Sequence, residues 1–288
     1  MWVGAHVPTR GRPAFAVEYA LEIGADAFQI FASNPRAWAP PPAPRPGTVR
    51  EFREARRAGR IGPVFAHSSY LVNIASPDEG FRRRSVDLAR RELETVGELG
   101  AEGLVIHAGA GGAGERPAAV ERAAASVLAI AGQGDGPEVV LELTAGGAGT
   151  VASTIPQAAE LLDAVDRHPG VALCLDTCHL FGAGAPLDDT DGVAETLRDL
   201  RRYRLSRTLR LVHANDARDP RGSRRDRHTH PGEGFIGEAG FRAILGHPAV
   251  RRCAVLVETR GGPEEHGRDV ATLRRLAGLG ERARGSVG

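Results

Sequence analysis

Six short apolar runs along the chain each end on a side chain that can bind a metal ion. The runs cover residues 64–67, 104–107, 139–142, 173–176, 210–213 and 255–258, and they end on His67, His107, Glu142, Asp176, His213 and Glu258. Successive endings lie about 35 to 45 residues apart, the length of one strand and one returning helix in a repeating β/α architecture. Two further apolar runs, residues 2–5 before His6 and residues 27–31, bring the predicted strands to eight.

Helical patterns separate the apolar runs, and the clearest cover residues 80–99, 116–131, 155–167 and 269–279. Thr154 is a predicted N-cap before Pro156, and Gly100 is a predicted C-terminal stop. The strands are apolar throughout rather than alternating, which indicates burial on both faces of a parallel sheet. The pattern therefore predicts an α/β fold, a single (β/α)8 TIM-type barrel with long loops on its C-terminal face.

The composition is that of one globular domain. The length of 288 residues suits one barrel, which we expect at residues 1–280, with a frayed tail at 281–288. The hydrophobic share of 42% and the charged share of 25% exclude extensive disorder. The net charge of +1, with arginine as the only basic residue besides histidine, neither favours nor excludes nucleic acid.

The start of the chain lacks a secretion signal, and no apolar run is long enough to cross a membrane. We therefore expect a cytoplasmic protein that acts as a monomer. In a reducing compartment its cysteines, Cys174, Cys178 and Cys253, are expected to be free thiols.

The carboxyl ends of all strands in a closed parallel barrel meet at one rim, so the six run endings predict one polar pocket. His179 lies three residues after Asp176, and Asp226 and His228 lie two apart in a long loop, which makes nine candidate ligands. Charges packed so densely repel one another unless cations hold them, and nine ligands suffice for two to three ions. Imidazole together with carboxylate suits zinc or manganese.

Several neighbouring residues leave alternatives open. Cys174 and Cys178 can be interpreted as ligands, although Cys174 alternates with leucines as a buried strand residue does. His6 is either a structural residue or a group that orients the ligands, and His230 competes with His228 for one ligand position. We interpret the remaining histidines as surface residues: His168, His247 and His266.

Two long connections follow strand ends and should overhang the same rim, residues 33–47 with a proline cluster and residues 215–237. The second holds a run of basic residues, Arg218, Arg221, Arg224, Arg225 and Arg227. A solvated loop is one interpretation, but a loop this basic above a multi-metal pocket favours a polyanion. Clustered divalent cations suit hydrolysis of a phosphodiester, because the attacking and leaving oxygens both need stabilisation.

Specific motifs stand at these positions. They are Leu-Asp-Thr-Cys-His at 175–179, His-Ala-Asn-Asp at 213–216, Gly-Ser-Arg-Arg-Asp-Arg-His at 222–228 and Gly-Glu-Gly at 232–234, with further matches at 4–7, 33–38 and 67–73. Together they resemble the signature of the endonuclease IV family of abasic-site DNA repair enzymes, over about residues 3 to 260. The resemblance implies three zinc ions. The first would be held by His67, His107 and Glu142, and Glu142 would bridge to the second, which is shared with Asp176, His213 and Glu258. The third would be held by His179, Asp226 and His228.

The resemblance also implies the reaction. The DNA backbone would be hydrolysed 5′ to an abasic site by a hydroxide that the zinc ions activate, leaving a 3′-hydroxyl and a 5′-deoxyribose phosphate, and blocked 3′ ends would be trimmed. Glu142 and Glu258 are the implied catalytic residues.

The implied partner is double-stranded DNA that contains abasic sites, bent so that the abasic nucleotide enters the pocket. Arg36 and Tyr70 are the candidates for filling the resulting gap, and the further candidates for contacting DNA are Arg224, Arg225 and Arg227. Two residues depart from the family pattern. Ala37 replaces a longer polar residue, which puts the filling of the gap in doubt, and Ala110 replaces a serine that contacts phosphate or supports the ligands.

Two other functions fit part of the sequence. A sugar isomerase or epimerase on the same barrel needs one metal and would use only Glu142, Asp176, His213 and Glu258. A metal-dependent DNA-binding protein without catalysis would keep the arginine loop but would need no bridging carboxylate. The surplus of candidate ligands favours the endonuclease.

Overall fold

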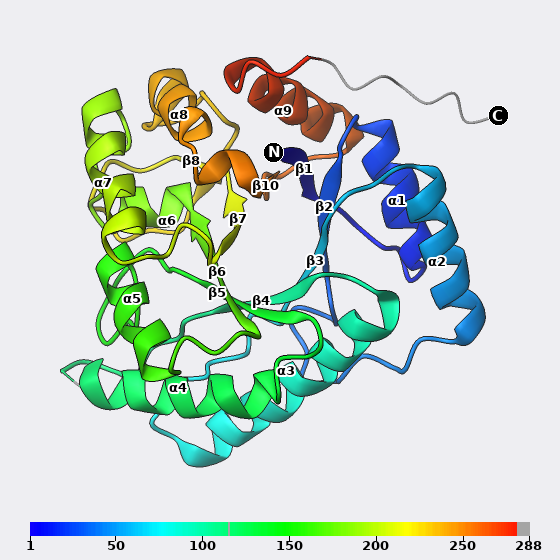
Figure 1. Ribbon diagram of the computed structural model, residues 1–288, viewed down its shortest axis with the longest axis horizontal. Helices are drawn as coiled ribbons and strands as arrows, with labels where there is room; N and C mark the ends of the chain where they lie inside the picture. The colour runs from blue at the N-terminus through cyan, green and yellow to red at the C-terminus, as the bar shows by residue number, and fades with distance from the viewer. Residues whose placement is uncertain (115, 281–288) are drawn as a thin grey trace.

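The computed structural model describes residues 1–114 and 116–280 and shows a closed barrel of eight parallel strands (Figure 1). The strands follow one another around the barrel in the order β1-β10-β7-β6-β5-β4-β3-β2, so the predicted (β/α)8 fold is confirmed. They are β1 (Trp2–His6), β2 (Ala27–Phe31), β3 (Val64–His67), β4 (Gly103–His107), β5 (Glu138–Glu142), β6 (Val171–Asp176), β7 (Leu209–His213) and β10 (Ala254–Val257). The predicted frayed tail, residues 281–288, lies outside the described residues.

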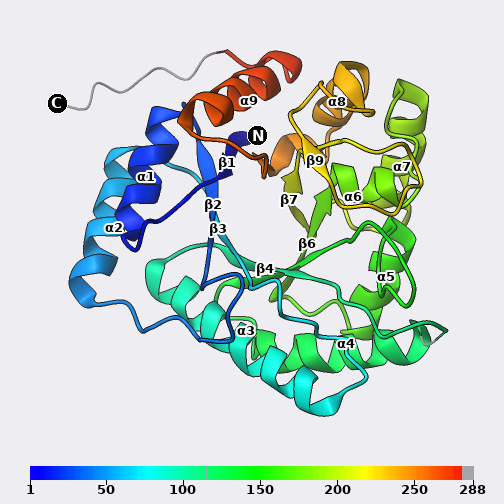
Figure 2. The same cartoon turned by 180° about the vertical axis from the view of Figure 1, so that it is seen from behind.

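Helices surround the barrel on its outer face, as both views show (Figures 1 and 2). They are α1 (Pro13–Glu22), α2 (Pro46–Ala58), α3 (Glu79–Leu99), α4 (Arg116–Ala131), α5 (Ile155–Ala164), α6 (Thr177–Gly182), α7 (Thr190–Arg202), α8 (Gly237–Gly246) and α9 (Pro263–Leu276), with a 3-10 turn η1 (Val250–Arg252) before β10. Thr154 caps α5 and Gly100 ends α3 in a left-handed conformation, as predicted.

Two predicted helix boundaries are wrong for local reasons. The helix predicted over 155–167 ends at Ala164, because Asp166 and Arg167 adopt positive φ angles of 50° and 47°, outside the helical region. The last helix begins at Pro263 rather than at 269, and a proline in its first turn favours this earlier start.

The long connection over residues 215–237 is not a plain loop. It contains two short antiparallel strands, β8 (Asp216–Ala217) and β9 (His228–Thr229), in which Ala217 pairs with His228. This ribbon brings the arginine-rich segment back to the rim of the barrel.

The prediction that His266 lies on the surface is also wrong. His266 is buried on the inner face of α9, where its Nδ1 lies 2.9 Å from the Tyr19 hydroxyl and its Nε2 lies 3.0 Å from the Thr259 carbonyl oxygen. Because α9 starts one and a half turns earlier than predicted, this histidine falls within the packed helix instead of a turn. His168 and His247 are partly buried.

The barrel interior is closed by a separate apolar cluster beneath the rim. It consists of Ala27, Phe65, Val105, Val140, Ala172, Cys174, Leu211, Ala254 and Leu256. The larger core packs the outer faces of the strands against the helices. Cys174 belongs to the interior cluster, as predicted, and all three cysteines are free, as predicted, and buried.

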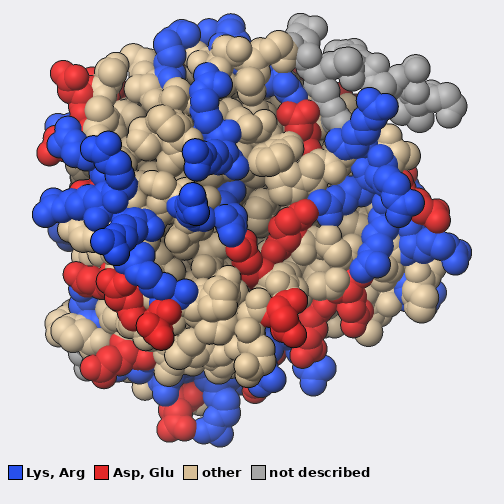
Figure 3. Space-filling model, viewed as in Figure 1, with Lys and Arg blue, Asp and Glu red and all other residues tan. Residues whose placement is uncertain are grey.

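The near-zero net charge conceals a local concentration of arginine. Residues 198–210 contain six arginines and one aspartate, and basic side chains gather over the region of α7 (Figure 3). The turn between α7 and β7 precedes the strand that His213 ends, so its arginines lie at the opposite end of the barrel from the rim. Within the described chain, no helix combines the length and the apolar character that crossing a lipid bilayer requires.

Candidate metal centre

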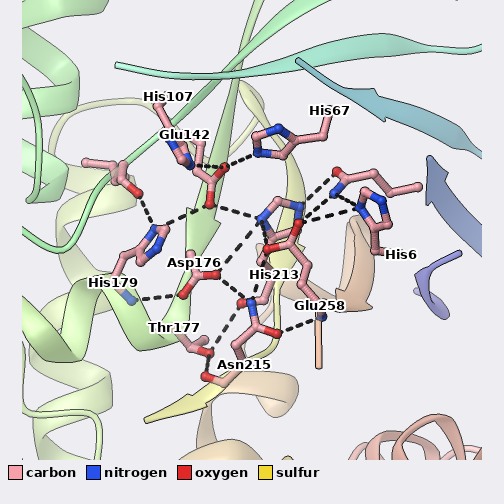
Figure 4. A network of polar contacts seen from close by, with 12 residues as sticks. His6, His67, His107, Glu142, Asp176, Thr177, His179, His213, Asn215 and Glu258 are labelled. Carbon is pink, nitrogen blue, oxygen red and sulfur yellow. Dashed lines mark hydrogen bonds and ion pairs between the residues drawn. The ribbon is translucent and has the colours of Figure 1, made fainter. Parts of the chain in front are cut away.

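The candidate ligands at the strand ends point into the barrel because of the two-residue repeat of a strand. On β4, Val105 belongs to the interior cluster and His107 follows two positions later on the same face; on β5, Val140 precedes Glu142 in the same way. The same spacing holds on β3, β6, β7 and at the end of β10. The candidate ligands therefore form a polar layer directly above the apolar cluster of the barrel interior. Figure 4 shows most of this layer, with the side chains directed toward one another.

Glu142 occupies the middle of this layer with both carboxylate oxygens engaged. Its Oε2 lies 3.1 Å from His67 Nε2 and 3.4 Å from His107 Nε2. Its Oε1 lies 3.1 Å from His213 Nδ1 on the other side. One carboxylate thus faces two separate groups of potential ligands.

The second group surrounds His213, which is fully buried. Its Nδ1 lies 3.3 Å from Glu258 Oε2 and 4.0 Å from Asp176 Oδ2. These atoms and Glu142 Oε1 form a set of four potential ligand atoms within 4.8 Å of one another.

The third group lies toward the arginine-rich loop and opens to solvent through Asp226. Asp226 Oδ1 lies 3.3 Å from His179 Nε2 and 2.9 Å from His228 Nε2. Both imidazole nitrogens are buried and make no hydrogen bond. Buried polar atoms without a hydrogen bond are rare, and two of them converging on one carboxylate oxygen fit the ligand set of a cation.

The orientation of the histidine rings also suits metal binding. His67 and His179 each place Nδ1 at 2.8 Å from a backbone carbonyl oxygen, of Ser68 and Leu143, which leaves Nε2 facing the centre. His213 is reversed, because its Nε2 lies 3.0 Å from Gln29 Oε1 and its Nδ1 faces the centre. Metal-binding histidines characteristically donate their other ring N–H to an oxygen in this way.

The spacing of the donor atoms fits zinc. Bonds of about 2.0 Å in tetrahedral geometry place two ligand atoms about 3.3 Å apart. The closest donor pairs in the three groups lie between 2.9 and 3.4 Å apart. The nine predicted ligands are thus gathered into three groups of the expected composition, with imidazole and carboxylate as the main donors.

Opposite charges compensate one another across the cluster. Burial opposes ionisation of Glu142, but His213 and His107 outweigh it and hold the pKa of this carboxyl well below its usual range. Burial likewise opposes protonation of His179, yet Asp176 and Asp226 raise its pKa well above the usual value. Without metal, protons on the imidazoles supply the positive charge that the carboxylates require, so metal binding should release protons.

Two amide side chains that the sequence analysis missed connect the ligands. Gln29 is fully buried, and its Nε2 donates to Glu258 Oε1 at 2.7 Å while its Oε1 contacts His213. Asn215 donates to Asp176 Oδ2 at 2.6 Å and accepts from the Glu258 backbone N–H at 2.7 Å. Gln29 follows Ala27 of the interior cluster by two residues, so the same strand spacing could have identified it.

A third residue without an assigned role, Asp216, organises the long loop. Its buried carboxylate accepts hydrogen bonds from four later backbone N–H groups, of Gly232, Gly234, Ile236 and Gly237, at 2.9–3.1 Å. The loop therefore returns to the barrel at a defined position next to β9, which carries His228.

The alternative ligands are less suitable. Cys174 and Cys178 lie near the second and third groups, but burial raises the pKa of each thiol to about 12, so neither offers a thiolate at neutral pH. His6 contacts Gln29 at 3.0 Å, and burial lowers its pKa to about 3. His230 turns away to Asp269, with its Nδ1 3.0 Å from the carboxylate.

The candidate DNA-contacting residues lie exposed around this layer. Tyr70 is 59% exposed and packs edge-on against Phe31, and Arg36 is exposed on the neighbouring loop. On the long loop the exposed candidates are Arg224, Arg225 and Arg227, of which Arg225 pairs with Asp219 at 3.0 Å. The rim is thus acidic at its centre and basic at its edge.

Comparison with known proteins agrees with this geometry. The family described as "Xylose isomerase-like TIM barrel" matches residues 17–276. A protein of Streptomyces coelicolor named probable endonuclease 4 is 40% identical over 279 residues, which cover 95% of this chain and 94% of that protein. A protein of the same name from Nitratidesulfovibrio vulgaris is 39% identical, covering 96% and 98%.

Solved structures show the same relationship. The crystal structure of endonuclease IV from Thermus thermophilus superposes with a TM-score of 0.85 at 34% identity, covering 96% of this chain and 98% of that one. A 3-keto-D-glucoside 4-epimerase from E. coli superposes with a TM-score of 0.67 at 19% identity, over 96% and 99%. The second likeness is one of fold alone.

We expect the metal-free protein to lose stability as the pH rises. Burial disfavours protonation of His228, but Asp176 and Asp226 outweigh it and raise its pKa to about 9. Because this value exceeds the value of about 6.5 in the unfolded chain, the stabilisation is fully present below pH 6.5 and is lost as the pH passes 9. Denaturant unfolding in the presence of a chelator should therefore show a falling free energy of unfolding between these values.

The variant His228→Gln should flatten part of this decline, by no more than about 3 kcal/mol. An unchanged pH dependence in the variant would show that the His228 ion pairs do not stabilise the fold.

Proposed function

The chain belongs to the endonuclease IV family of DNA repair endonucleases, and on this premise we propose that it hydrolyses DNA at abasic sites. Cleavage occurs 5′ to the abasic site and leaves a 3′-hydroxyl and a 5′-deoxyribose phosphate, and the same centre trims blocked 3′ ends. Three zinc ions serve the reaction, and the protein acts as a monomer on double-stranded DNA.

The observation that carries this proposal is the sharing of Glu142 between two groups of ligands, with a third group nearby. A single-metal isomerase would use only the group around His213. It would give no reason for the buried Nε2 atoms of His179 and His228, which make no hydrogen bond, to converge on Asp226. A binding protein without catalysis would not need a carboxylate with both oxygens directed at separate ligand groups.

The zinc ions, once bound, would lower the pKa of a water molecule and neutralise charge on the phosphate. The residues of the chain prepare the site for this. Glu142 contributes one oxygen to each of two ligand groups and so fixes the distance between these groups. Gln29 and Asn215 orient Glu258 by donating hydrogen bonds to its two carboxylate oxygens. The side chains that would hold the ions are therefore fixed before DNA arrives, which lowers the cost of reaching the transition state.

Recognition of the abasic site is assigned to the rim. Arg36 and Tyr70 carry the planar groups that replace lost base stacking when the duplex is bent. Arg224, Arg225 and Arg227 contact phosphates on either side, because their guanidinium groups are exposed beside the open third ligand group.

Ala110, which departs from the family pattern, lies in the loop after β4, and this loop is held by hydrogen bonds to its backbone. Asn73 donates to the Ala110 carbonyl oxygen at 2.9 Å and accepts from the Ala110 N–H at 3.1 Å. These backbone contacts need no side chain at position 110, so we propose that the loop keeps its conformation and loses only a direct polar contact.

The variant Glu142→Gln tests the central role of the shared carboxylate. It preserves the volume of the side chain but removes its charge, so incision of a duplex with one abasic site should fall by more than about 100-fold, since even partners outside a ligand set cost 10–100-fold. Gel electrophoresis of the labelled strand measures the rate. Glu121→Gln, an exposed position on α4, is the matched control. Activity within a few-fold of the wild type would contradict the assignment.

Metal content separates the endonuclease from an isomerase. Elemental analysis of purified protein should give about three zinc ions per chain, as three ligand groups of three or four residues require. The Glu142→Gln variant should hold fewer. A ratio near one in the wild type would favour the single-metal alternative.

The variant Arg36→Ala tests recognition of the gap. Stacking on one planar side chain is worth about 1–3 kcal/mol, so the Kd for abasic duplex should rise about tenfold or more while single-turnover cleavage changes little. Fluorescence anisotropy measures the Kd. Arg207→Ala, an exposed arginine at the other end of the barrel, is the control. Equal affinity of the Arg36 variant and the wild type would refute the role.

A further inference from the structure

Glu92 is a buried carboxylate outside the ligand groups, and nothing so far explains its position. It lies on α3 with 0% of its surface exposed, and within the described chain it forms no ion pair with a basic side chain. A buried charge without an ion pair is costly unless strong hydrogen bonds compensate it. The position therefore needs a reason.

Three hydrogen-bond donors compensate Glu92, and all come from the rim. The Ser33 hydroxyl donates to Oε1 at 2.5 Å, the Ser68 hydroxyl donates to Oε2 at 2.5 Å, and the Ser69 N–H donates to Oε1 at 3.2 Å. Ser33 follows the end of β2, and Ser68 directly follows the end of β3. One carboxylate thus joins the loops after two adjacent strands.

The two loops are also joined directly. The Tyr70 N–H and the Ser69 hydroxyl both donate to the Pro35 carbonyl oxygen at 3.1 Å. Pro35 precedes Arg36, and Ser69 precedes Tyr70. The backbone at both Arg36 and Tyr70 is therefore linked to Glu92 through the hydrogen bonds of Ser69. Both side chains are exposed, and Tyr70 packs edge-on against Phe31, so the position of the backbone beneath strongly limits where they point.

The same carboxylate reaches the metal centre through Ser68. While the Ser68 hydroxyl contacts Glu92, its carbonyl oxygen lies 2.8 Å from His67 Nδ1. The residue that orients the His67 ring is therefore itself fixed by Glu92. No other acidic residue among those described connects a ligand to the recognition loops.

We propose that Glu92 is a positioning residue for damage recognition: it holds the loops 33–36 and 68–70 in the arrangement that presents Arg36 and Tyr70 to an abasic site. This inference rests on the proposed function. Glu92 does not touch DNA or metal. It holds the loops in one arrangement before DNA binds, so less conformational entropy is lost on binding and the affinity is higher.

The variant Glu92→Gln tests the proposal. Its amide keeps the size of the side chain but weakens charge-assisted hydrogen bonds, so the Kd for a labelled abasic duplex should rise about tenfold. Zinc content should stay within about twofold of the wild type, because His67 keeps its contacts with the Ser68 carbonyl oxygen and with Glu142, and single-turnover cleavage at saturating DNA should fall by less than the rise in Kd. Glu94→Gln, an exposed glutamate on the same helix, is the matched control and should change none of these quantities.

A double-mutant cycle distinguishes positioning from a general structural role. If Glu92 acts through Arg36 and Tyr70, the Glu92→Gln change should raise the Kd more in the wild-type background than in Arg36→Ala, and it should have no effect when Arg36 and Tyr70 are both replaced by Ala. Equal increases in both backgrounds would overturn the proposal. Should Glu92→Gln fail to fold, Ser33→Ala can replace it, because it removes only the hydrogen bond from Ser33 to Glu92. It should raise the Kd in the same backgrounds, but by a smaller factor.

Hydrogen exchange gives a readout that does not depend on the reaction. The Tyr70 amide should exchange faster in Glu92→Gln, because its acceptor loop is released. Faster exchange with an unchanged Kd would overturn the recognition role. A wild-type protein that neither binds nor cleaves abasic duplex would instead refute the proposed function, so the two failures are distinguishable.

Discussion

The compensation of one buried carboxylate, Glu142, is the interaction on which the rest of the site depends. Its oxygens lie within 3.4 Å of the nitrogens of four imidazoles, those of His67, His107, His179 and His213. A carboxylate at this depth is tolerated only when positive charge or hydrogen-bond donors surround it, and here the imidazoles supply the charge. The histidines lie on β3, β4, β7 and on α6 after β6, so the requirement for charge balance at one point constrains about half of the barrel rim.

The barrel makes this arrangement possible by separating two layers. The lower layer is apolar and excludes water from beneath the ligands, while the upper layer consists of residues two positions further along the same strands. The low dielectric below strengthens the electrostatic interactions above. The separation also explains why Cys174 is inert: it belongs to the lower layer, although it lies two residues before Asp176.

Outside the ligands, a few buried polar side chains determine where the loops lie. Asp216 binds four backbone N–H groups of the long loop, Asn215 joins two ligands, and Glu92 joins the loops after β2 and β3. A loop on the rim has little apolar surface to bury, so packing alone does not fix its position. The hydrogen bonds of these three side chains fix it instead. The site therefore combines a fixed metal centre with recognition loops whose positions are set from below.

The periodic endings on His, Asp and Glu were enough to predict the barrel, its strands and the gathering of six candidate ligands, because the length of a β/α unit and the two-residue repeat of a strand are local properties of the chain. The other three, His179, Asp226 and His228, were identified from their spacing in a helix and a loop and from the family motifs. The roles of Gln29, Glu92 and Asp216 could not be predicted in this way, since each depends on partners that are distant in the sequence, at separations from 16 to 184 residues, and that closure of the barrel brings close. The burial of His266 was mispredicted for the same reason, because its contacts with Tyr19 arise only when the last helix packs against the first. Residue types and their spacing determined the chemistry, whereas closure of the barrel decided which oxygen faces which nitrogen.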